Sequence, residues 1–517
     1  MVVADINTAM TDHEQLIASL QNESLYPHAI EKFSVQETHI SSVILTGEFA
    51  YKFKKPVNFG FLDFSTLAKR KFFCEEELRL NQRLAPQLYL EVVPVSGTVY
   101  EPVLGKNHKP IEYCVKMKEF PQSAQLDRVL QQHGLKNDHV DQLASTVASF
   151  HQHAAQAGSD SDYGSPLQIH QPVLENFSHI LRSVSNPELI TRLEKLKQWC
   201  QQRFEQLETT FIDRKQHGFI REGHGDMHLR NIALIDNEVV LFDCLEFNPE
   251  LRWVDTISDI AFLVMDLEDR NQTALAWRFL NRYLEISGDY TGAELLDYYK
   301  VYRALVRAKV DAIRLGQDHL SNDEKQNTLS DFTNYLELAE KDAHRDKPAL
   351  ILTRGVSGSG KSYYSQQLLE EITAIRIRSD VERKRLYPES GQQRYSDAAN
   401  QHTYQYLQSQ AESLCRSGYN LIIDATFLNN DFIQPFKQLA ATNNFSFVIL
   451  EFSASPATLQ QRIRQRHGDD SEATVNIMQQ QLQHWQELSG DVQDSVINID
   501  TENTVDIKQL ARQIQAH

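Results

Sequence analysis

The sequence predicts an α+β domain followed by an α/β domain built on a doubly wound parallel sheet. Its 517 residues are too many for one ordinary hydrophobic core. Short β-like runs and one helical pattern fill the first third, and the chain is then mainly helical to about residue 345. After a charged stretch closed by Pro348, runs that are apolar on both faces alternate with helices, which is typical of a parallel sheet covered on both sides.

The expected elements follow in chain order. β-like runs cover 41–47, 48–55, 88–95 and 111–120, and a helical pattern covers about 66–84. Helical spacing then extends from about 124 to 345, interrupted by one β-like patch at 231–247. Apolar β-type runs return at 349–355, 374–380, 420–427, 447–452 and 495–500. We therefore expect three parts, over 1–120, 121–345 and 348–517.

The composition is that of an ordinary globular protein. With 52 Lys and Arg against 70 Asp and Glu, the formal net charge is −18, and 41% of the residues are hydrophobic. This excludes a mainly disordered or collagen-like chain, and the acidic balance disfavours broad, non-specific binding to nucleic acid or anionic membranes. The five cysteines include no Cys-x-x-Cys pair, so we expect buried thiols of a reducing compartment.

The first residues, MVVADINTAMTDHEQL, lack the basic segment and apolar core of a secretory signal. No stretch of eighteen apolar residues occurs in the sequence, so we expect no membrane-spanning helix and no membrane partner. Together these features predict a cytoplasmic protein.

Residues 355–362 read GVSGSGKS and fit the phosphate-loop pattern G-x-x-x-x-G-K-[ST], between a strand-like run and a helical pattern. In such a loop, backbone N–H groups surround phosphate oxygens. We expect Lys361 to reach the β- and γ-phosphates of ATP, and the Ser362 hydroxyl to reach Mg²⁺. The expected nucleotide-binding residues are Gly355, Ser357, Gly358, Ser359, Gly360, Lys361 and Ser362.

Two later β-runs of the C-terminal domain each end in an acid, at the edge where ligands bind in open α/β sheets. Asp380 follows one run, with Arg383 three residues on, and Asp424 ends the other. A carboxylate facing the phosphate loop can hold the Mg²⁺ shell or accept a proton from an attacking hydroxyl. The alternatives are a helix N-cap for Asp380 and a strand-end turn residue for Asp424.

Arg462 and Arg466 lie one helical turn apart. Arginines on one helix face suit a lid that closes on transferring phosphates, and the alternative is a solvated amphipathic helix.

These motifs together give residues 348–517 a resemblance to the small P-loop kinases of the polynucleotide kinase, zeta-toxin and gluconate kinase type. The resemblance implies that Asp380 activates the acceptor hydroxyl, with Arg383 nearby, and that the lid arginines contact the phosphates. It leaves a nucleic-acid end, a nucleoside, a sugar and an antibiotic open as acceptor. For a nucleic-acid end, a local basic groove could be lined by Arg376, Arg378, Arg383, Lys384 and Arg385.

A second polar motif lies at residues 223–247. Asp226 is followed by Asn231 in a D-x-x-x-x-N spacing, and Asp243 ends the apolar run VVLFD. Phosphoryl transfer needs an acceptor for the hydroxyl proton and oxygen ligands that place Mg²⁺ on the phosphates. Asp226 as base, with Asn231 and Asp243 as metal ligands, would supply that set. An Asp-Asn loop alone is most often a turn, so the ordered combination points to the site.

This arrangement resembles the aminoglycoside phosphotransferase family, whose fold is that of protein kinases. Residues 45–120 and 223–267 resemble the conserved-hypothetical branch often fused to a C-terminal P-loop domain. The resemblance implies a bilobal protein-kinase-like domain, with a small lobe over 1–120 and a mostly helical large lobe over 121–345.

The same resemblance implies further roles. Lys52, or alternatively Lys54, meets the α- and β-phosphates, and Glu77, or alternatively Glu76, is the lysine's helical partner. Backbone groups near Met117 and Glu119 meet adenine at the hinge between the lobes. The usual Gly-rich loop is not evident. Acids after about 250, such as Asp255 and Asp259, are expected to brace the catalytic loop, and the alternative is that they bind a cationic substrate.

The sequence therefore predicts a bifunctional, ATP-dependent and Mg²⁺-dependent kinase with two nucleotide sites. Its expected partners are small-molecule hydroxyl acceptors, with a nucleic-acid end open for the C-terminal domain. The alternative is a nucleotide-sensing regulatory protein, with a P-loop switch and a pseudo-kinase module that binds without transfer.

Overall fold

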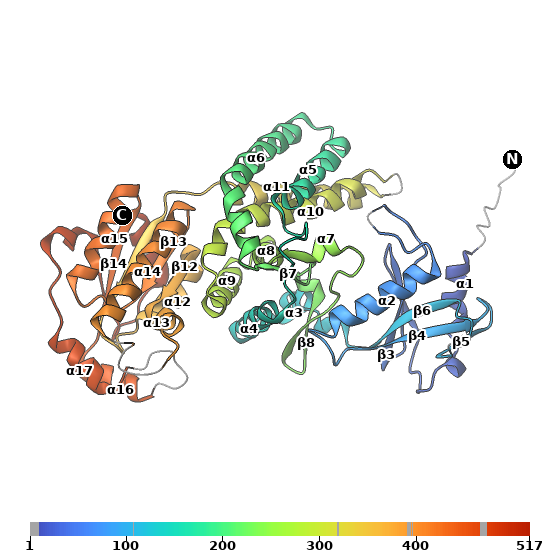
Figure 1. Ribbon diagram of the computed structural model, residues 1–517, viewed down its shortest axis with the longest axis horizontal. Coiled ribbons are helices and arrows are strands. Elements are labelled where there is room, and N and C mark those ends of the chain that lie inside the picture. Colours follow the sequence, from blue (N-terminus) through green and yellow to red (C-terminus); the bar gives the residue numbers. More distant parts are fainter. Residues whose placement is uncertain are drawn as a thin grey trace. The chain divides into compact units, whose positions relative to one another are not determined.

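The computed structural model describes residues 10–60, 62–106, 108–317, 320–389, 394, 396–465 and 473–517 (Figure 1). The chain divides into two compact units. The first comprises Met1–His139, His153–Gln168 and Lys215–Asp259, and the second comprises Val140–Gln152, Ile169–Arg214 and Ile260–His517.

The first unit is built on a six-stranded antiparallel sheet in the order β1-β2-β3-β6-β4-β5. Helix α2, Leu67–Asn81, packs across β4 and β6 around Cys74 and Val115 (Figure 1). It begins where the Thr66 hydroxyl accepts a hydrogen bond from the backbone N–H of Lys69. The strands are β1 (Ser34–Glu37), β2 (Ser41–Leu45), β3 (Phe49–Lys54), β4 (Tyr89–Gly97), β5 (Pro102–Leu104) and β6 (Glu112–Lys118), with a short helix α1 (Asp12–Ser19) before them.

A short hairpin of the first unit carries the polar motif of residues 223–247. β8 (Ile232–Ile235) pairs with β9 (Glu238–Leu241) through a turn in which Asp236 and Asn237 both have positive φ, a geometry that matches the twist of a tight hairpin. A second pair, β7 (Ile220–Glu222) and β10 (Trp253–Asp255), flanks this segment in the sequence.

Helices dominate the stretch between the two sheets, as the sequence predicts. They are α3 (Leu126–His133), α4 (Asn137–His153), α5 (Pro166–Ser183), α6 (Pro187–Gln216), α7 (Pro249–Arg252), α8 (Thr256–Asp269), α9 (Thr273–Ser287), α10 (Leu296–Leu315) and α11 (Asn322–Asp342).

The C-terminal part of the second unit has a five-stranded parallel sheet in the order β12-β13-β11-β14-β15. Its strands are β11 (Ala349–Arg354), β12 (Ala374–Arg378), β13 (Asn420–Asp424), β14 (Ser446–Ser453) and β15 (Val496–Asp500). The helices are α12 (Lys361–Ile372), α13 (Ser379–Leu386), α14 (Asp397–Arg416), α15 (Asn430–Asn443), α16 (Pro456–Gln465), α17 (Val475–Gln483) and α18 (Ile507–Gln515).

Helices cover both faces of this sheet. Side chains of α12 and α18 share one apolar core with β11, β13, β14 and β15, centred on Ile351 and Val448. Outside that core, α14 packs against β11 and β13, and α15 packs against β14. The prediction of a doubly wound parallel sheet is therefore confirmed.

The predicted β-runs and the helix at about 66–84 correspond to strands and a helix of the structure, whereas α1, β1, β5, β7 and β10 were not predicted. Each of these five elements is short, so its periodicity is weak. All five cysteines are free and buried. Within the described ranges, none of the helices combines the length and the apolar character needed to cross a bilayer.

Candidate active sites

Two lysines of β3 share one buried glutamate of α2. Lys52 Nζ lies 2.7 Å from Glu77 Oε1, and Lys54 Nζ lies 2.7 Å from Glu77 Oε2. Burial alone would raise the pKa of Glu77, but the two ammonium groups outweigh it and hold that pKa well below its usual value. The neighbouring Glu76 has other partners, Arg79 and Arg252.

The two lysines differ in what else they touch. Lys52 Nζ also lies 2.6 Å from Asp243 Oδ1, and the Asp243 side chain is 41% exposed. Lys54 instead pairs with Glu246, and both of these side chains are buried. Lys52 is therefore the lysine that faces the candidate metal ligand, and Lys54 lies in the interior behind it.

The loop before β8 holds Asp226 against Asn231. The Asn231 side-chain nitrogen donates to both the carbonyl oxygen and the Oδ2 of Asp226, at 3.0 Å each. Because the amide nitrogen is used in this way, the amide oxygen is the atom that Asn231 can offer to a cation. The Asp226 side chain remains 39% exposed, so its carboxylate is accessible from solvent.

Asp259 braces this loop, as the sequence suggested. Its carboxylate accepts hydrogen bonds from the backbone N–H groups of His224 (2.7 Å) and Gly225 (2.9 Å). The approach is so close that a Cβ added at Gly223 would come within 2.5 Å of Asp259 Oδ2. Glycine is therefore required there.

His224 ties the loop to the segment after β9. Its Nε2 lies 3.0 Å from the carbonyl oxygen of Phe242, and its Nδ1 lies 3.3 Å from the backbone nitrogen of Asp226. A carbonyl only accepts and an N–H only donates, so this imidazole is neutral with its proton on Nε2. Burial lowers the pKa of His224, in agreement with that assignment.

Asp243 has a backbone φ of 63°, a region that side-chain-bearing residues rarely adopt. Its backbone N–H donates to the hydroxyl of Tyr89 at 3.1 Å. Strained backbone of this kind persists where surrounding structure fixes it, which is common at functional sites. The sequence gives no signal for this contact, because Tyr89 is one of several apolar or aromatic residues of a β-run.

The predicted hinge residues lie at the end of β6. Met117 packs against the apolar core of α2 and the sheet. The Glu119 backbone N–H donates to the carbonyl oxygen of Glu48 at 3.0 Å, and its carboxylate accepts from the N–H groups of Thr46 and Gly47. The Glu119 carboxylate thus orders the turn between β2 and β3. Its role toward adenine stays a prediction.

The residues of this first site fit a nucleotide-bound divalent cation. Asp243 offers a partly exposed carboxylate and Asn231 an amide oxygen, and both are hard oxygen donors. The described residues include no group of three or more His, Cys, Asp or Glu side chains that could hold a metal. Two protein donors suffice for Mg²⁺ in such sites, where phosphate oxygens and water complete the coordination.

The phosphate loop joins β11 to α12 at the centre of the parallel sheet. Gly355 has φ 147°, and a Cβ there would lie 2.6 Å from the carbonyl oxygen of Phe452. Gly358 has φ 86°, with the carbonyl oxygen of Leu459 at 3.0 Å from the same added atom. Only glycine fits this turn, whose close packing places backbone N–H groups at the start of α12.

A pocket of about 350 Å³ opens over this loop. It brings together phosphate-loop residues with Asp380, Asp424 and Arg462, as the sequence predicts for the tips of a parallel sheet. Its lining consists of Ser357, Gly358, Gly360, Lys361, Ser362, Tyr363, Arg378, Ser379, Asp380, Asp424, Ala425, Thr426, Arg462 and Gln465.

Polyphosphate and Mg²⁺ fit the groups around the loop. Lys361 Nζ donates to the carbonyl oxygens of Gly355 (2.8 Å) and Val356 (3.1 Å), so it lies folded over the loop. The buried Ser359 hydroxyl has no hydrogen-bond partner among the described residues. Ser362 and Asp424 are oxygen donors in the same pocket.

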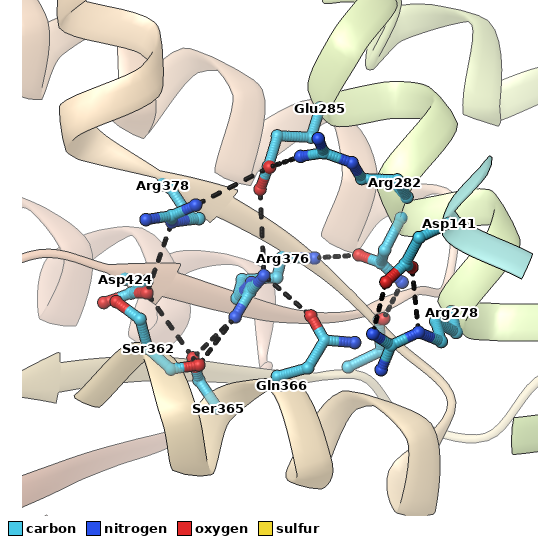
Figure 2. Close-up of polar contacts among 12 residues, drawn as sticks. Asp141, Arg278, Arg282, Glu285, Ser362, Ser365, Gln366, Arg376, Arg378 and Asp424 are labelled. Atoms are coloured by element: carbon cyan, nitrogen blue, oxygen red, sulfur yellow. Dashed lines mark hydrogen bonds and ion pairs between the residues drawn. The ribbon is translucent and has the colours of Figure 1, made fainter. Parts of the chain in front are cut away.

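Asp424 is contacted by three side chains, of which Figure 2 shows Ser365 and Arg378. The Thr353 hydroxyl donates to its Oδ1 at 3.3 Å and the Ser365 hydroxyl to its Oδ2 at 3.4 Å. Arg378 Nε lies 3.9 Å from Oδ2. The register of the sheet explains this meeting, since Thr353, Arg378 and Asp424 are aligned on neighbouring strands.

The arginines predicted for this site differ in their contacts and in whether they line the pocket. Arg462 donates to Gly358 and to Thr501, which fastens α16 to the loop and to the end of β15. Arg383 is buried and donates to the carbonyl oxygen of Arg394. It is not one of the described residues that line the pocket. Arg466 lies outside the described residues.

Asp380 lies in the first turn of α13, so it is not the N-cap, which is Arg378. The structure does not support the basic groove suggested for a nucleic-acid end. Arg376 and Arg383 are buried, and Arg385 pairs with Glu382.

The fold and the family matches define a two-domain protein of the phosphotransferase class. Residues 69–296 match the phosphotransferase enzyme family, and residues 350–488 match the AAA domain family. The chain is 32% identical over 467 residues to the uncharacterized proteins Rv2004c of Mycobacterium tuberculosis and Mb2027c of Mycobacterium bovis. The matches cover 87% of this chain and 90% of each relative.

The chain therefore belongs to the family of these mycobacterial proteins. In this chain, an aminoglycoside phosphotransferase-like domain precedes a P-loop kinase-like domain. Its class is that of ATP-dependent kinases, which use ATP together with a divalent cation.

The amicoumacin kinase hAmiN, in complex with AMP-PNP, Ca²⁺ and Ami, is 12% identical with a TM-score of 0.39, over 63% of this chain and 93% of that chain. A gluconokinase from Sinorhizobium meliloti is 18% identical with a TM-score of 0.26, over 33% of this chain and 92% of that chain.

Proposed function

We propose that this protein is a bifunctional kinase with two Mg·ATP sites, each of which transfers the γ-phosphate to a hydroxyl group of a small molecule. The observation that carries the proposal is that two separate groups of charged and phosphate-binding residues are each brought together by the fold. Lys52, Glu77 and Asp243 meet in the first unit, and the phosphate loop meets Asp380 and Asp424 in a pocket of the second.

In the first site, Asp226 accepts the proton of the acceptor hydroxyl, because it is exposed and held by Asn231. Asn231 and Asp243 hold Mg²⁺, and Lys52 binds the α- and β-phosphates. The bound Mg·ATP supplies the phosphoryl group and neutralises its charge. Glu77 orients Lys52, and Asp259 keeps the loop in place.

In the second site, the backbone of the phosphate loop and Lys361 hold the phosphates, while Ser362 and Asp424 hold the cation. Asp380 is the base for the acceptor, since it lines the same pocket at the start of α13. Arg462 lies on the loop side of the pocket, where it can contact the transferring group.

Single-site variants test the proposal. Lys361→Ala and Asp226→Ala should each remove one of two separable ATP-consuming activities, in an acceptor screen with ATP labelled at the γ-phosphate. The parent should bind two equivalents of AMP-PNP with Mg²⁺ per chain, and ADP should form only when an acceptor is present. One tightly bound nucleotide and no acceptor-dependent turnover would contradict the proposal and favour a nucleotide sensor.

A further inference from the structure

Helix α9, which precedes the P-loop domain in the chain, presents one polar face to it. Arg278, Asn281, Arg282 and Glu285 recur at spacings of three and four residues, so they share a side of the helix. This side lies against β12 and α12 within the second unit (Figure 2). It therefore adjoins α12, which follows the phosphate loop, and β12, whose last residue, Arg378, lines the pocket.

Asn281 completes the edge of the parallel sheet. β12 is an edge strand, whose outward backbone groups need partners. The Asn281 side chain accepts from the N–H of Arg376 at 2.7 Å and donates to the carbonyl oxygen of Ala374 at 2.9 Å. One buried amide thus fixes the backbone beneath Arg376, as a neighbouring strand would.

Glu285, one turn further along α9, faces two arginines of β12. Its Oε2 lies 3.7 Å from Arg376 Nη2, and its Oε1 lies 3.6 Å from Arg378 Nη1. All three side chains are 8 to 11% exposed. The pairs are therefore shielded from solvent, where a charge interaction is much stronger than at the surface.

The same two arginines also touch the candidate cation site. Arg376 Nη1 donates to the carbonyl oxygen of Ser362 at 3.0 Å and to the Ser365 hydroxyl at 3.1 Å. Arg378 Nε lies 3.9 Å from Asp424 Oδ2. Arg376 therefore links Glu285 to Ser362, and Arg378 links Glu285 to Asp424.

Glu285 and Asp424 both supply a carboxylate to these arginines. The two guanidinium groups face Glu285 on one side and Asp424 on the other. Without the charge of Glu285, Arg378 would be attracted more strongly to Asp424 and the local field would become more positive, which disfavours Mg²⁺. Arg282 also pairs with Glu285, but it is 42% exposed and its charge is screened by solvent.

We propose that Glu285 is a positioning residue of the P-loop site, which holds Arg376 and Arg378 so that Asp424 stays available to Mg²⁺. The inference rests on the proposed function in taking Asp424 as a metal ligand. It means that the nucleotide site of the C-terminal domain depends on an acid supplied by the helical region before it, so the two parts act as one structural unit.

Calorimetric titration of the full-length chain with AMP-PNP at graded Mg²⁺ concentrations tests this. The titrations use an Asp243→Asn background to silence the first site, and Lys361→Ala identifies the signal of the P-loop site. Glu285→Gln, which removes the charge and keeps the shape, should raise the Mg²⁺ concentration for half-maximal binding about tenfold. Asp141→Asn is the matched control, because Asp141 pairs with Arg278 on the same α9 face, away from Asp424 (Figure 2).

A double variant that removes one negative and one positive charge makes the test specific. Adding Arg378→Gln to Glu285→Gln should return the Mg²⁺ requirement toward that of Arg378→Gln alone, which a general loss of packing would not do. Glu285→Asp keeps the charge and should stay close to the parent, which preserves the test if the Gln variant folds poorly. Equal effects of Glu285→Gln and Asp141→Asn, or additive effects in the double variant, would overturn the inference. An unchanged AMP-PNP signal in Lys361→Ala would instead overturn the proposed P-loop function.

Discussion

Lys52 Nζ lies 2.6 Å from a carboxylate oxygen of Asp243, although 191 positions separate the two residues in the chain. Strand β3 supplies the lysine and the segment after β9 supplies the acid. Because Glu77 also contacts Lys52, at 2.7 Å, the lysine is held between a structural acid and a candidate metal ligand. Lys54, by contrast, contacts Glu246 in place of Asp243.

Lys52→Met should mainly reduce activity, whereas Lys54→Met should mainly reduce stability. Lys52→Met should fold and lose phosphotransfer at the first site by about 100-fold or more, since the phosphate contact is lost. Lys54→Met leaves Glu77 and Glu246 buried with one cation fewer, so it should lower the free energy of unfolding by about 3–5 kcal/mol. Urea unfolding and single-site kinetics of both variants check this, and a Lys52→Met enzyme with parental turnover would contradict it.

Asp259→Asn should reduce turnover at the first site more than nucleotide binding. The carboxylate orders the loop by accepting two backbone hydrogen bonds, and an amide can present only one oxygen to them. We expect kcat to fall about 100-fold while the KM for ATP changes little, because the base and not the phosphate contacts is displaced. Asp255→Asn, whose acid accepts from Ile257 instead, is the control. Equal losses in both variants would refute a specific bracing role.

The free energy of unfolding of the first unit should fall in acid because Glu77 becomes protonated. Its folded pKa is depressed, so its charged form stabilises the fold above the ordinary value of 4.5 and this contribution is lost as the pH falls below it. Between that value and the lower folded pKa, the loss should be about 1.4 kcal/mol per pH unit. The difference in unfolding free energy between the parent and Glu77→Gln should therefore be constant near neutrality and shrink in acid. A difference that stays constant to pH 3.5 would contradict the assignment.

Local motifs in the sequence were enough to predict the class and to select residues that the structure brings close together. A phosphate loop is a contiguous turn whose glycines are required by backbone geometry, and Gly355 and Gly358 adopt the positive φ values that this implies. Asp424 and Asp380 follow strands of one parallel sheet, so their shared edge could be inferred from strand order along the chain.

Tertiary structure alone decided which charged residue meets which. Glu76 and Glu77 are neighbours on a helix, and only the packing of α2 on the sheet turns Glu77 toward the lysines and Glu76 toward Arg79 and Arg252. The role of Glu285 had no sequence signal, because it lies about ninety positions before the arginines that it faces and sits in an ordinary amphipathic helix. Periodicity in a sequence reports which face of an element is buried, but the partner on the other side is set by how the elements pack.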